Sequence, residues 1–198
     1  MEKEITKNRQ ATEMTLITAV NDIIEESGFE GLGINAVAAK AKVSKMLIYR
    51  YFNSLDGLIA AYIQQNDYWI NFDEELPDQA HLAAFIKQIF KRQIMRLREN
   101  YTLKRLYRWE LTTDNKFVKE LRNKREEKGI WLVEAVSKLS KHPKKEIAAM
   151  ASIITAAISY LALLEENCPV YNGLKTSQLP SLFWLRTMQG TSRDKQSS

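Results

Sequence analysis

The sequence is poor in cysteine, glycine and proline. Its 198 residues include one cysteine, seven glycines and four prolines. The single cysteine, Cys168, cannot form an intrachain disulfide, so a reducing compartment is expected. The chain also does not open with the charged and then apolar segment of a secretion signal. We therefore expect a cytoplasmic protein.

Motifs for enzymatic chemistry are equally scarce. There is no HExxH zinc motif, no glycine-rich phosphate loop and no cluster of cysteine and histidine, and His81 and His142 stand alone. We expect no catalytic residue, no metal and no cofactor. Two alternatives stay open, a small helical enzyme and a helical module that binds proteins rather than DNA. Turnover of a ligand would favour the first, and failure to shift the DNA flanking the protein's own reading frame would favour the second.

Apolar residues recur with the 3.6-residue period of an α-helix along most of the chain, and the alternation typical of strands does not persist. Apolar residues make up 45% of the sequence, enough for a substantial core. The pattern predicts an all-α fold. We expect helices at about 11–27, within 34–52 (two short ones), from 54 or 55 toward 69, after Pro77, at 115–141 and at 147–164. The charged run 119–128 is expected on the solvated side of its helix.

The segment 28–58 is the most informative part of the sequence, because it combines two short helical patterns, a tight turn and an aromatic, basic helix face. Ser44 is placed to cap the second short helix. This is the arrangement of a helix-turn-helix that reads DNA. The positions expected to face its small core are Val37, Ala38, Ala41, Ile48 and Phe52.

The other face of the second short helix is expected to meet DNA. Cations bind phosphates or guanine edges, and phenol hydroxyls donate to phosphate oxygens. Residues 33–56 contain four cations and one acidic residue, Asp56. The cations are Lys40, Lys42, Lys45 and Arg50. An N-terminal arm adds Lys3, Lys7 and Arg9 for phosphates. The expected DNA contacts are Asn35, Ser44, Lys45, Met46, Leu47, Tyr49, Arg50 and Tyr51.

This stretch resembles the TetR family of bacterial transcriptional regulators. The family signature has a small residue, a Val-Ser step, a Tyr-x-Tyr/His-Phe run and a downstream leucine at these intervals, and the resemblance covers about residues 15–63. Lys42 departs from it, because glycine usually precedes the Val-Ser step and a lysine there must adopt a left-handed backbone. Gly33 and Leu55 also depart, since a capping hydroxyl and a phosphate-binding lysine are common at those positions.

The resemblance implies a three-helix DNA-binding domain at 1–56 and a helical domain for effector binding and dimerisation at 57–198. It implies a ligand-responsive repressor that binds a palindromic double-stranded operator as a homodimer. A small-molecule effector would bind two conformational states of the protein unequally and so favour a rotation of the fourth helix. The DNA-reading helices of the two subunits would then no longer fit successive major grooves. The sequence identifies neither the effector nor the operator.

Large aromatic residues are frequent in the middle of the chain, and core packing accounts for most of them. The resemblance to TetR-type effector domains favours a cavity among them, for an effector that is partly aromatic or apolar. The residues expected to line it are Tyr107, Trp109 and Trp131.

Residues 147–164 carry no charge, so this segment is either buried or spans a membrane. Its alanine-rich composition with serine and threonine, and the DNA-binding pattern before it, favour a buried helix and no membrane. A helix that is apolar all round cannot show half its surface to water, so one face needs a second subunit. Together with segment 177–190 it predicts a four-helix homodimer interface, in which we expect Ile154, Ile158, Leu161 and Phe183.

Overall fold

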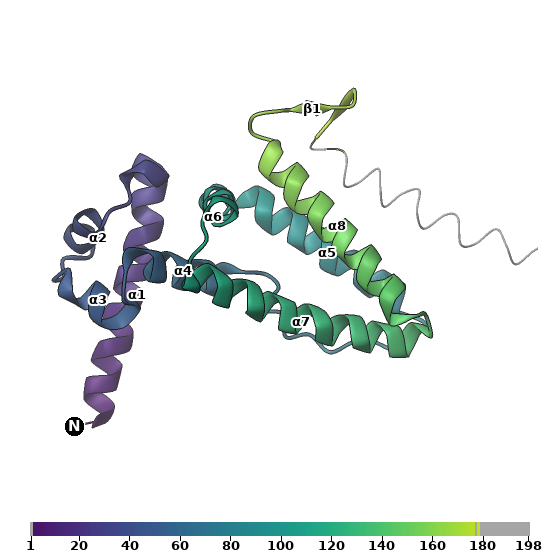
Figure 1. Ribbon diagram of the computed structural model, residues 1–198, viewed down its shortest axis with the longest axis horizontal. Coiled ribbons are helices and arrows are strands. Elements are labelled where there is room, and N and C mark those ends of the chain that lie inside the picture. The colour runs from purple at the N-terminus through teal and green to yellow at the C-terminus, as the bar shows by residue number, and fades with distance from the viewer. Residues whose placement is uncertain (1, 177, 179–198) are drawn as a thin grey trace, which may run out of the picture. The chain divides into compact units, whose positions relative to one another are not determined.

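The computed structural model describes residues 2–176 and 178, with side chains from residue 8 onward. This part of the chain contains eight α-helices, one turn of 3-10 helix and one short hairpin (Figure 1), which confirms the all-α fold. The elements are α1 (Glu2–Ser27), η1 (Phe29–Gly31), α2 (Ile34–Ala41), α3 (Met46–Phe52), α4 (Leu55–Asn66), α5 (Leu82–Glu99), α6 (Tyr101–Thr112), α7 (Lys116–Ser140), α8 (Lys144–Leu164), β1 (Val170–Tyr171) and β2 (Leu174–Lys175).

The boundaries of three elements differ from the expectation. Helix α1 begins at Glu2 rather than near residue 11. Helix α4 ends at Asn66, before residue 69, because the side chain of Asp67 accepts hydrogen bonds from the backbone N–H groups that follow it. The hairpin was not expected, although Asn172 and Gly173 supply the two left-handed residues (φ 51° and 75°) of a tight two-residue turn.

The chain divides into two compact units. Unit 1 comprises residues 1–72 and 101–128, and unit 2 comprises residues 73–100 and 129–198. The first part of α7 belongs to unit 1 and the rest to unit 2. Helices α4 and α6 therefore group with the helix-turn-helix by contact. The functional division expected after residue 56 stays a prediction.

Unit 1 is built around one apolar core that the first four helices share. Helix α1 packs against α2 and α4, and α3 packs against α4. Leu106 of α6 and Leu121 of α7 join the same core. Of the expected core positions, Phe52 is half-buried and the others are buried, which confirms the spacing argument. Core side chains exposed by 2% or less include Leu16, Val20, Ile24, Val37, Ile48, Leu58 and Ile63.

The start of α7 lies close against the start of α4, both within unit 1. A Cβ atom on Gly57 would lie 2.0 Å from the carbonyl oxygen of Phe52 and 3.0 Å from the ring of Phe117, so only glycine fits. Asn115 caps α7 by accepting from the backbone N–H groups of residues 117 and 118, each at 3.0 Å. Its amide also donates to Asp56 Oδ2 at 2.9 Å, which ties α7 to the first turn of α4.

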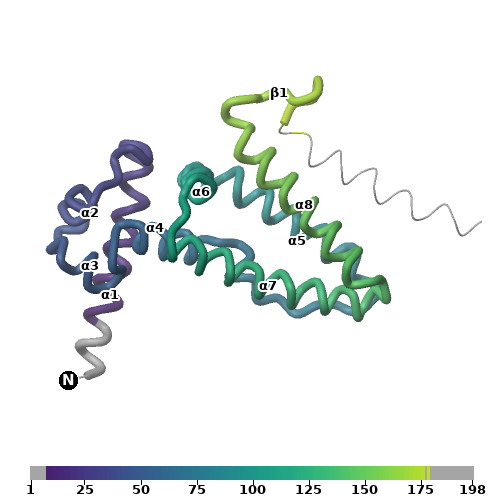
Figure 2. Tube along the Cα trace, in the orientation of Figure 1, coloured from purple at the N-terminus to yellow at the C-terminus, as the bar shows by residue number. Residues whose placement is uncertain are grey.

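In unit 2, helices α5 and α8 lie side by side (Figure 2). Arg98 of α5 pairs with Glu165 at 2.9 Å and donates to the carbonyl oxygen of Thr176 at 3.0 Å. Helix α8 is long and apolar enough to span a membrane. Only 11% of its most apolar 18-residue stretch is buried. Its buried residues are Ile158 and Ala162 alone. The described part of the chain therefore buries only two residues of α8 fully and leaves several of its large apolar side chains exposed.

Alkaline pH tests the contact between α1 and α4. Tyr62 of α4 is 4% exposed and donates from its hydroxyl to Asn21 Oδ1 of α1 at 2.6 Å. Burial, assisted by Glu25, raises the pKa of Tyr62 to about 12. Its unfolded pKa is about 10. This contribution to stability is therefore complete below about pH 10 and is lost as the pH rises toward 12.

We expect Tyr62→Phe to lose about 1 kcal/mol of unfolding free energy at neutral pH, because the bond to Asn21 disappears. The variant should also lose less stability than wild type between about pH 9.5 and pH 11.5. Urea unfolding across that range measures both effects. An alkaline decline as steep in the variant as in wild type would contradict the assignment.

Candidate nucleic-acid interface

The turn between α2 and α3 contains the left-handed residue that the sequence predicts. Lys42 has φ 55° and ψ 39°, which costs a side-chain-bearing residue about 1 kcal/mol. The backbone N–H of Lys42 donates to Ala39 O at 3.2 Å, and that of Val43 donates to Ala38 O at 3.0 Å. These two bonds close α2 and set the direction in which α3 leaves the turn.

The first turn of α3 is held mainly by backbone bonds. The N–H groups of Leu47 and Ile48 donate to Ser44 O at 3.0 Å and Lys45 O at 3.1 Å. The Ser44 hydroxyl accepts from the N–H of Met46 at 3.4 Å, a long bond, and Lys45 is the residue directly before the helix. Ser44 therefore caps α3 only weakly, because it lies one residue too early for an N-cap.

One face of α3 is open to solvent. Met46 is 65% exposed and Tyr49 is 45% exposed, and Lys45 and Arg50 are exposed beside them. In the described part of the chain neither of these two cations forms an ion pair, so both are available to an anionic partner. Asn35 is exposed on the first turn of α2.

Leu47 and Tyr51 do not share this exposure. Both are half-buried and pack against the apolar core of unit 1. They lie one turn apart on the flank of α3 that adjoins buried Ile48, so the helix presents a narrower face than expected. Arg9 of α1 covers the ring of Tyr51, with its Cζ atom 5.2 Å from the ring centroid. The side chains of Lys3 and Lys7 lie outside the described residues.

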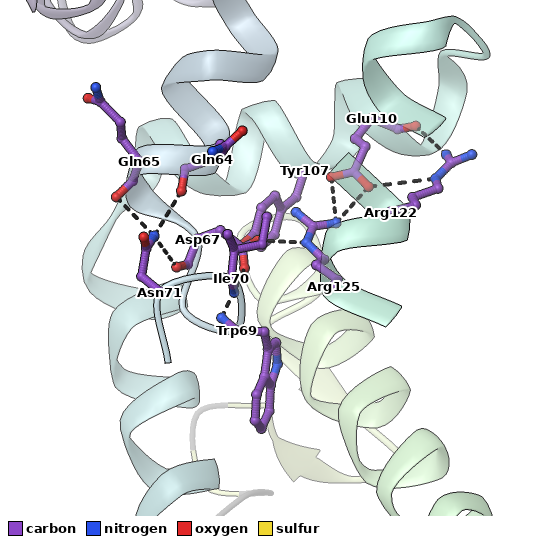
Figure 3. A network of polar contacts seen from close by, with 10 residues as sticks. All are labelled: Gln64, Gln65, Asp67, Trp69, Ile70, Asn71, Tyr107, Glu110, Arg122 and Arg125. Atoms are coloured by element: carbon purple, nitrogen blue, oxygen red, sulfur yellow. Dashed lines mark hydrogen bonds and ion pairs between the residues drawn. The ribbon is translucent and has the colours of Figure 1, made fainter. Parts of the chain in front are cut away.

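A buried polar network joins the end of α4 to α6 and α7 within unit 1 (Figure 3). Asp67 is fully buried. Its Oδ1 atom accepts from the backbone N–H groups of Trp69 and Ile70, each at 2.9 Å. Its Oδ2 atom accepts from the hydroxyl of Tyr107 at 2.8 Å and from Nε of Arg125 at 2.6 Å. One carboxylate thus fixes the end of α4 to two other helices.

Arg125 links that carboxylate to a second one. Its Nη1 atom donates to both carboxylate oxygens of Glu110, at 2.7 and 2.8 Å, and its Cζ atom lies 4.9 Å from the ring centroid of Tyr107. Burial by itself lowers the pKa of Arg125, but Asp67, Tyr107 and Glu110 outweigh it and raise the pKa. Burial also raises the pKa of Tyr107 far above its ordinary value. The network is therefore ionised at Arg125 and protonated at Tyr107 at neutral pH.

Sequence reasoning did not find this network. Arg125 was expected on the solvated side of its helix, whereas its side chain is only 23% exposed. Its partners lie 15 and 58 residues away in the sequence. Helical spacing reports only contacts within one helix, so no local signal distinguishes this arginine from its exposed neighbours.

The residues expected to line an effector cavity fall in both units. Tyr107 has its hydroxyl bonded to Asp67 and its ring against Arg125. Trp109, also on α6, packs against Phe29 with ring centroids 6.2 Å apart. Trp131 lies in the unit 2 part of α7 and is 48% exposed. The cavity stays a prediction.

The residues expected at a dimer interface differ in their exposure. Ile158 is 6% exposed and Ile154 and Leu161 are half-buried, while Phe183 lies outside the described residues. The apolar side chains that α8 leaves open are Met150 (58% exposed), Ile153 (69%) and Tyr160 (55%). These exposed side chains lie on the neighbouring face of the same helix, and the dimer interface stays a prediction.

The comparison with family profiles found a match that covers the helix-turn-helix. Residues 16–62 match the profile described as "Bacterial regulatory proteins, tetR family". The matched range runs from the first core residue of α1 into α4 and contains the whole helix-turn-helix. Residues 16–62 therefore form an N-terminal domain of the TetR-family type. The comparison with curated proteins found no match.

Solved structures of TetR-like proteins share the fold over most of the chain. A Clostridium perfringens protein described as a fatty acid metabolism regulator is 20% identical, with a TM-score of 0.58, covering 89% of this chain and 97% of its own. A TetR-like regulator from Rhodococcus sp. RHA1 is 18% identical, with a TM-score of 0.56 and coverage of 92% and 97%. A TetR regulator from Agrobacterium tumefaciens is 18% identical, with a TM-score of 0.57 and coverage of 88% and 93%.

The buried network predicts unequal effects for two arginines on α7. Arg125→Met leaves the buried carboxylate of Asp67 without its cation and Glu110 with only its longer contact to Arg122, so we expect a loss of about 3 kcal/mol or more of unfolding free energy. Arg122→Met, one turn earlier, removes an arginine that is 45% exposed, lies 3.7 Å from Glu110 Oε1 and donates to Glu110 O at 2.8 Å, so its loss should be smaller, about 1 kcal/mol.

Urea unfolding of both variants measures the difference. If Arg125→Met does not fold, the combined variant Asp67→Asn, Glu110→Gln, Arg125→Met removes all three charges and should recover part of the stability. Equal losses in the two single variants would contradict the role assigned to Arg125.

Proposed function

We propose that this protein is a cytoplasmic repressor that binds a palindromic operator as a homodimer and is released by a small-molecule effector. The observation that carries the proposal is the solvent-facing surface of α3, where Lys45 and Arg50 have no anionic partner in the described part of the chain. An exposed helix of this size with free cations and a phenol fits the major groove of DNA.

The side chains of this surface take different parts in the proposed complex. Lys45 and Arg50 read base edges or bind phosphates. Tyr49 donates its hydroxyl to a phosphate, and Met46 lies against thymine methyl groups or sugars. The remaining proposed contacts come from positions around this face: Asn35 on α2, Ser44 before α3, and Leu47 and Tyr51 on the half-buried flank.

The homodimer is supported by the open apolar face of α8. One reading helix makes few base contacts, whereas two copies related by a two-fold axis read half-sites about one DNA turn apart, roughly 34 Å. The open face mixes the large side chains of Met150, Ile153 and Tyr160 with exposed small residues such as Ser152 and Ala156. Small residues allow close helix approach, so a second protein helix fits this face better than lipid.

Effector release is supported by the way α4 is held. This helix packs against α3 and is bonded to α7 through Asp56 and Asn115, Gln64 and Lys124, and Asp67 and Arg125. An effector that displaces α4 must break these contacts or move α7 with it. A differential binding free energy of about 2 to 3 kcal/mol lowers operator affinity roughly 30- to 150-fold. We propose a partly aromatic or apolar effector, with Tyr107, Trp109 and Trp131 as the first residues to test.

The DNA surface is tested with duplexes that the wild-type protein selects from a random library. Arg50→Ala and Lys45→Ala should weaken binding of the selected duplex by about 1 to 3 kcal/mol and relax its base preference. Tyr49→Phe should weaken selected and scrambled duplexes alike, because it removes a phosphate contact. Fluorescence anisotropy with both duplexes measures these effects. If Arg50→Ala bound both duplexes as wild type does, the proposed orientation of α3 would be wrong.

The dimer surface is tested by placing a charge on α8. Ile153→Arg should convert a dimer to monomers in sedimentation velocity, because an unpaired charge in an apolar helix interface is strongly unfavourable. Leu111→Arg is the matched control, since Leu111 is 71% exposed on α6 and lies outside the proposed interface. A dimer that persists in Ile153→Arg would contradict the use of this face.

A further inference from the structure

The N-terminal part of α1 extends beyond what the core of unit 1 requires. Helix α1 begins at Glu2, whereas the first buried residue from position 8 onward, where side chains are described, is Leu16, and the family match also begins at residue 16. Residues 8–15 are exposed or half-buried. Core packing and the shared family pattern therefore leave these turns of helix without an explanation.

Arg9 connects this extension to the recognition helix. Its guanidinium lies over the ring of Tyr51 of α3, with Cζ 5.2 Å from the ring centroid. Its Nε atom donates to Glu13 Oε1 at 2.8 Å, one turn further along α1. The side chain is still 58% exposed. A cation is thus held beside the surface that is proposed to meet DNA.

Helix stability does not account for this arrangement. An arginine four residues before a glutamate is the less favourable order of such a pair in an α-helix. Stacking on Tyr51 instead fixes the position of the guanidinium relative to α3. Guanidinium has five N–H donors and Glu13 takes the one on Nε, so among the residues whose side chains are described the two terminal nitrogen atoms have no other hydrogen-bond acceptor.

We propose that Arg9 is a DNA-phosphate-binding residue, seated on Tyr51 and held in place by Glu13 when DNA is absent. The proposal rests on the proposed operator binding and adds a contact from outside the helix-turn-helix. The two terminal nitrogen atoms match two oxygen atoms of one phosphate. Glu13 carries the same charge as that phosphate, so its carboxylate opposes the complex that Arg9 favours.

The experiment measures the salt dependence of binding, because each phosphate contact contributes about 0.9 to the slope of log K against log salt concentration. Arg9→Ala should lower this slope by about 0.9 on the selected and the scrambled duplex alike, and should weaken binding severalfold at low salt. Lys119→Ala is the control. It removes one positive charge from an exposed residue of α7 that pairs with Asp114 and should leave the slope unchanged.

Glu13→Gln tests the opposing charge. It keeps the side-chain shape but removes the negative charge, so both duplexes should bind more tightly to this variant than to the wild-type protein. An Arg9→Ala variant with the wild-type slope would overturn the proposal, whether or not affinity falls, because a purely structural role changes affinity without changing the number of phosphates bound. Wild-type protein that binds no duplex at all would instead overturn the proposed function.

Discussion

The structure of unit 1 depends on one buried carboxylate. Asp67 has no contact with solvent, so its charge must be balanced inside the protein. Two backbone N–H groups, the Tyr107 hydroxyl and Arg125 together provide that balance, and they come from the chain after α4, from α6 and from α7. Because leaving such a charge unpaired costs several kcal/mol, the end of α4 has one stable position relative to those helices.

The position of α4 in turn fixes the position of α3. Helix α3 packs directly on α4, and the start of α4 is fixed by Gly57 against Phe117 and by Asp56 against Asn115. Both ends of α4 are therefore tied to α7. The contact units reflect the same fact, since α4, α6 and the first part of α7 group with the helix-turn-helix. The functional boundary predicted after residue 56 would separate helices that pack against one another in unit 1.

The features that sequence reasoning predicted depend on local spacing or local sterics. Apolar periodicity identifies the helices and the buried positions of α2 and α3, and the family signature identifies Lys42 as a left-handed residue. The network around Asp67 was out of reach, because Glu110 and Arg125 meet it only after three helices have packed. Helical spacing also predicted a wider exposed face of α3 than the structure has. Spacing alone cannot distinguish the half-buried flank that holds Leu47 and Tyr51 from the exposed face that holds Tyr49. The Asn172-Gly173 pair is a local signal for the hairpin turn, because both residues tolerate a left-handed backbone.

The two surfaces that unit 1 and unit 2 leave open differ in chemistry, and each calls for a different kind of partner. The face of α3 exposes cations that have no anionic partner in the described part of the chain. A polyanion can pair with them at little desolvation cost, because these side chains are already in water. The face of α8 exposes apolar side chains between small and polar ones, and only another apolar surface of matching shape gains from covering them. In the proposed homodimer, a second copy of the chain supplies that surface and, at the same time, a second α3. One association would thus cover the exposed face of α8 and double the number of base contacts, which a short helix cannot achieve alone.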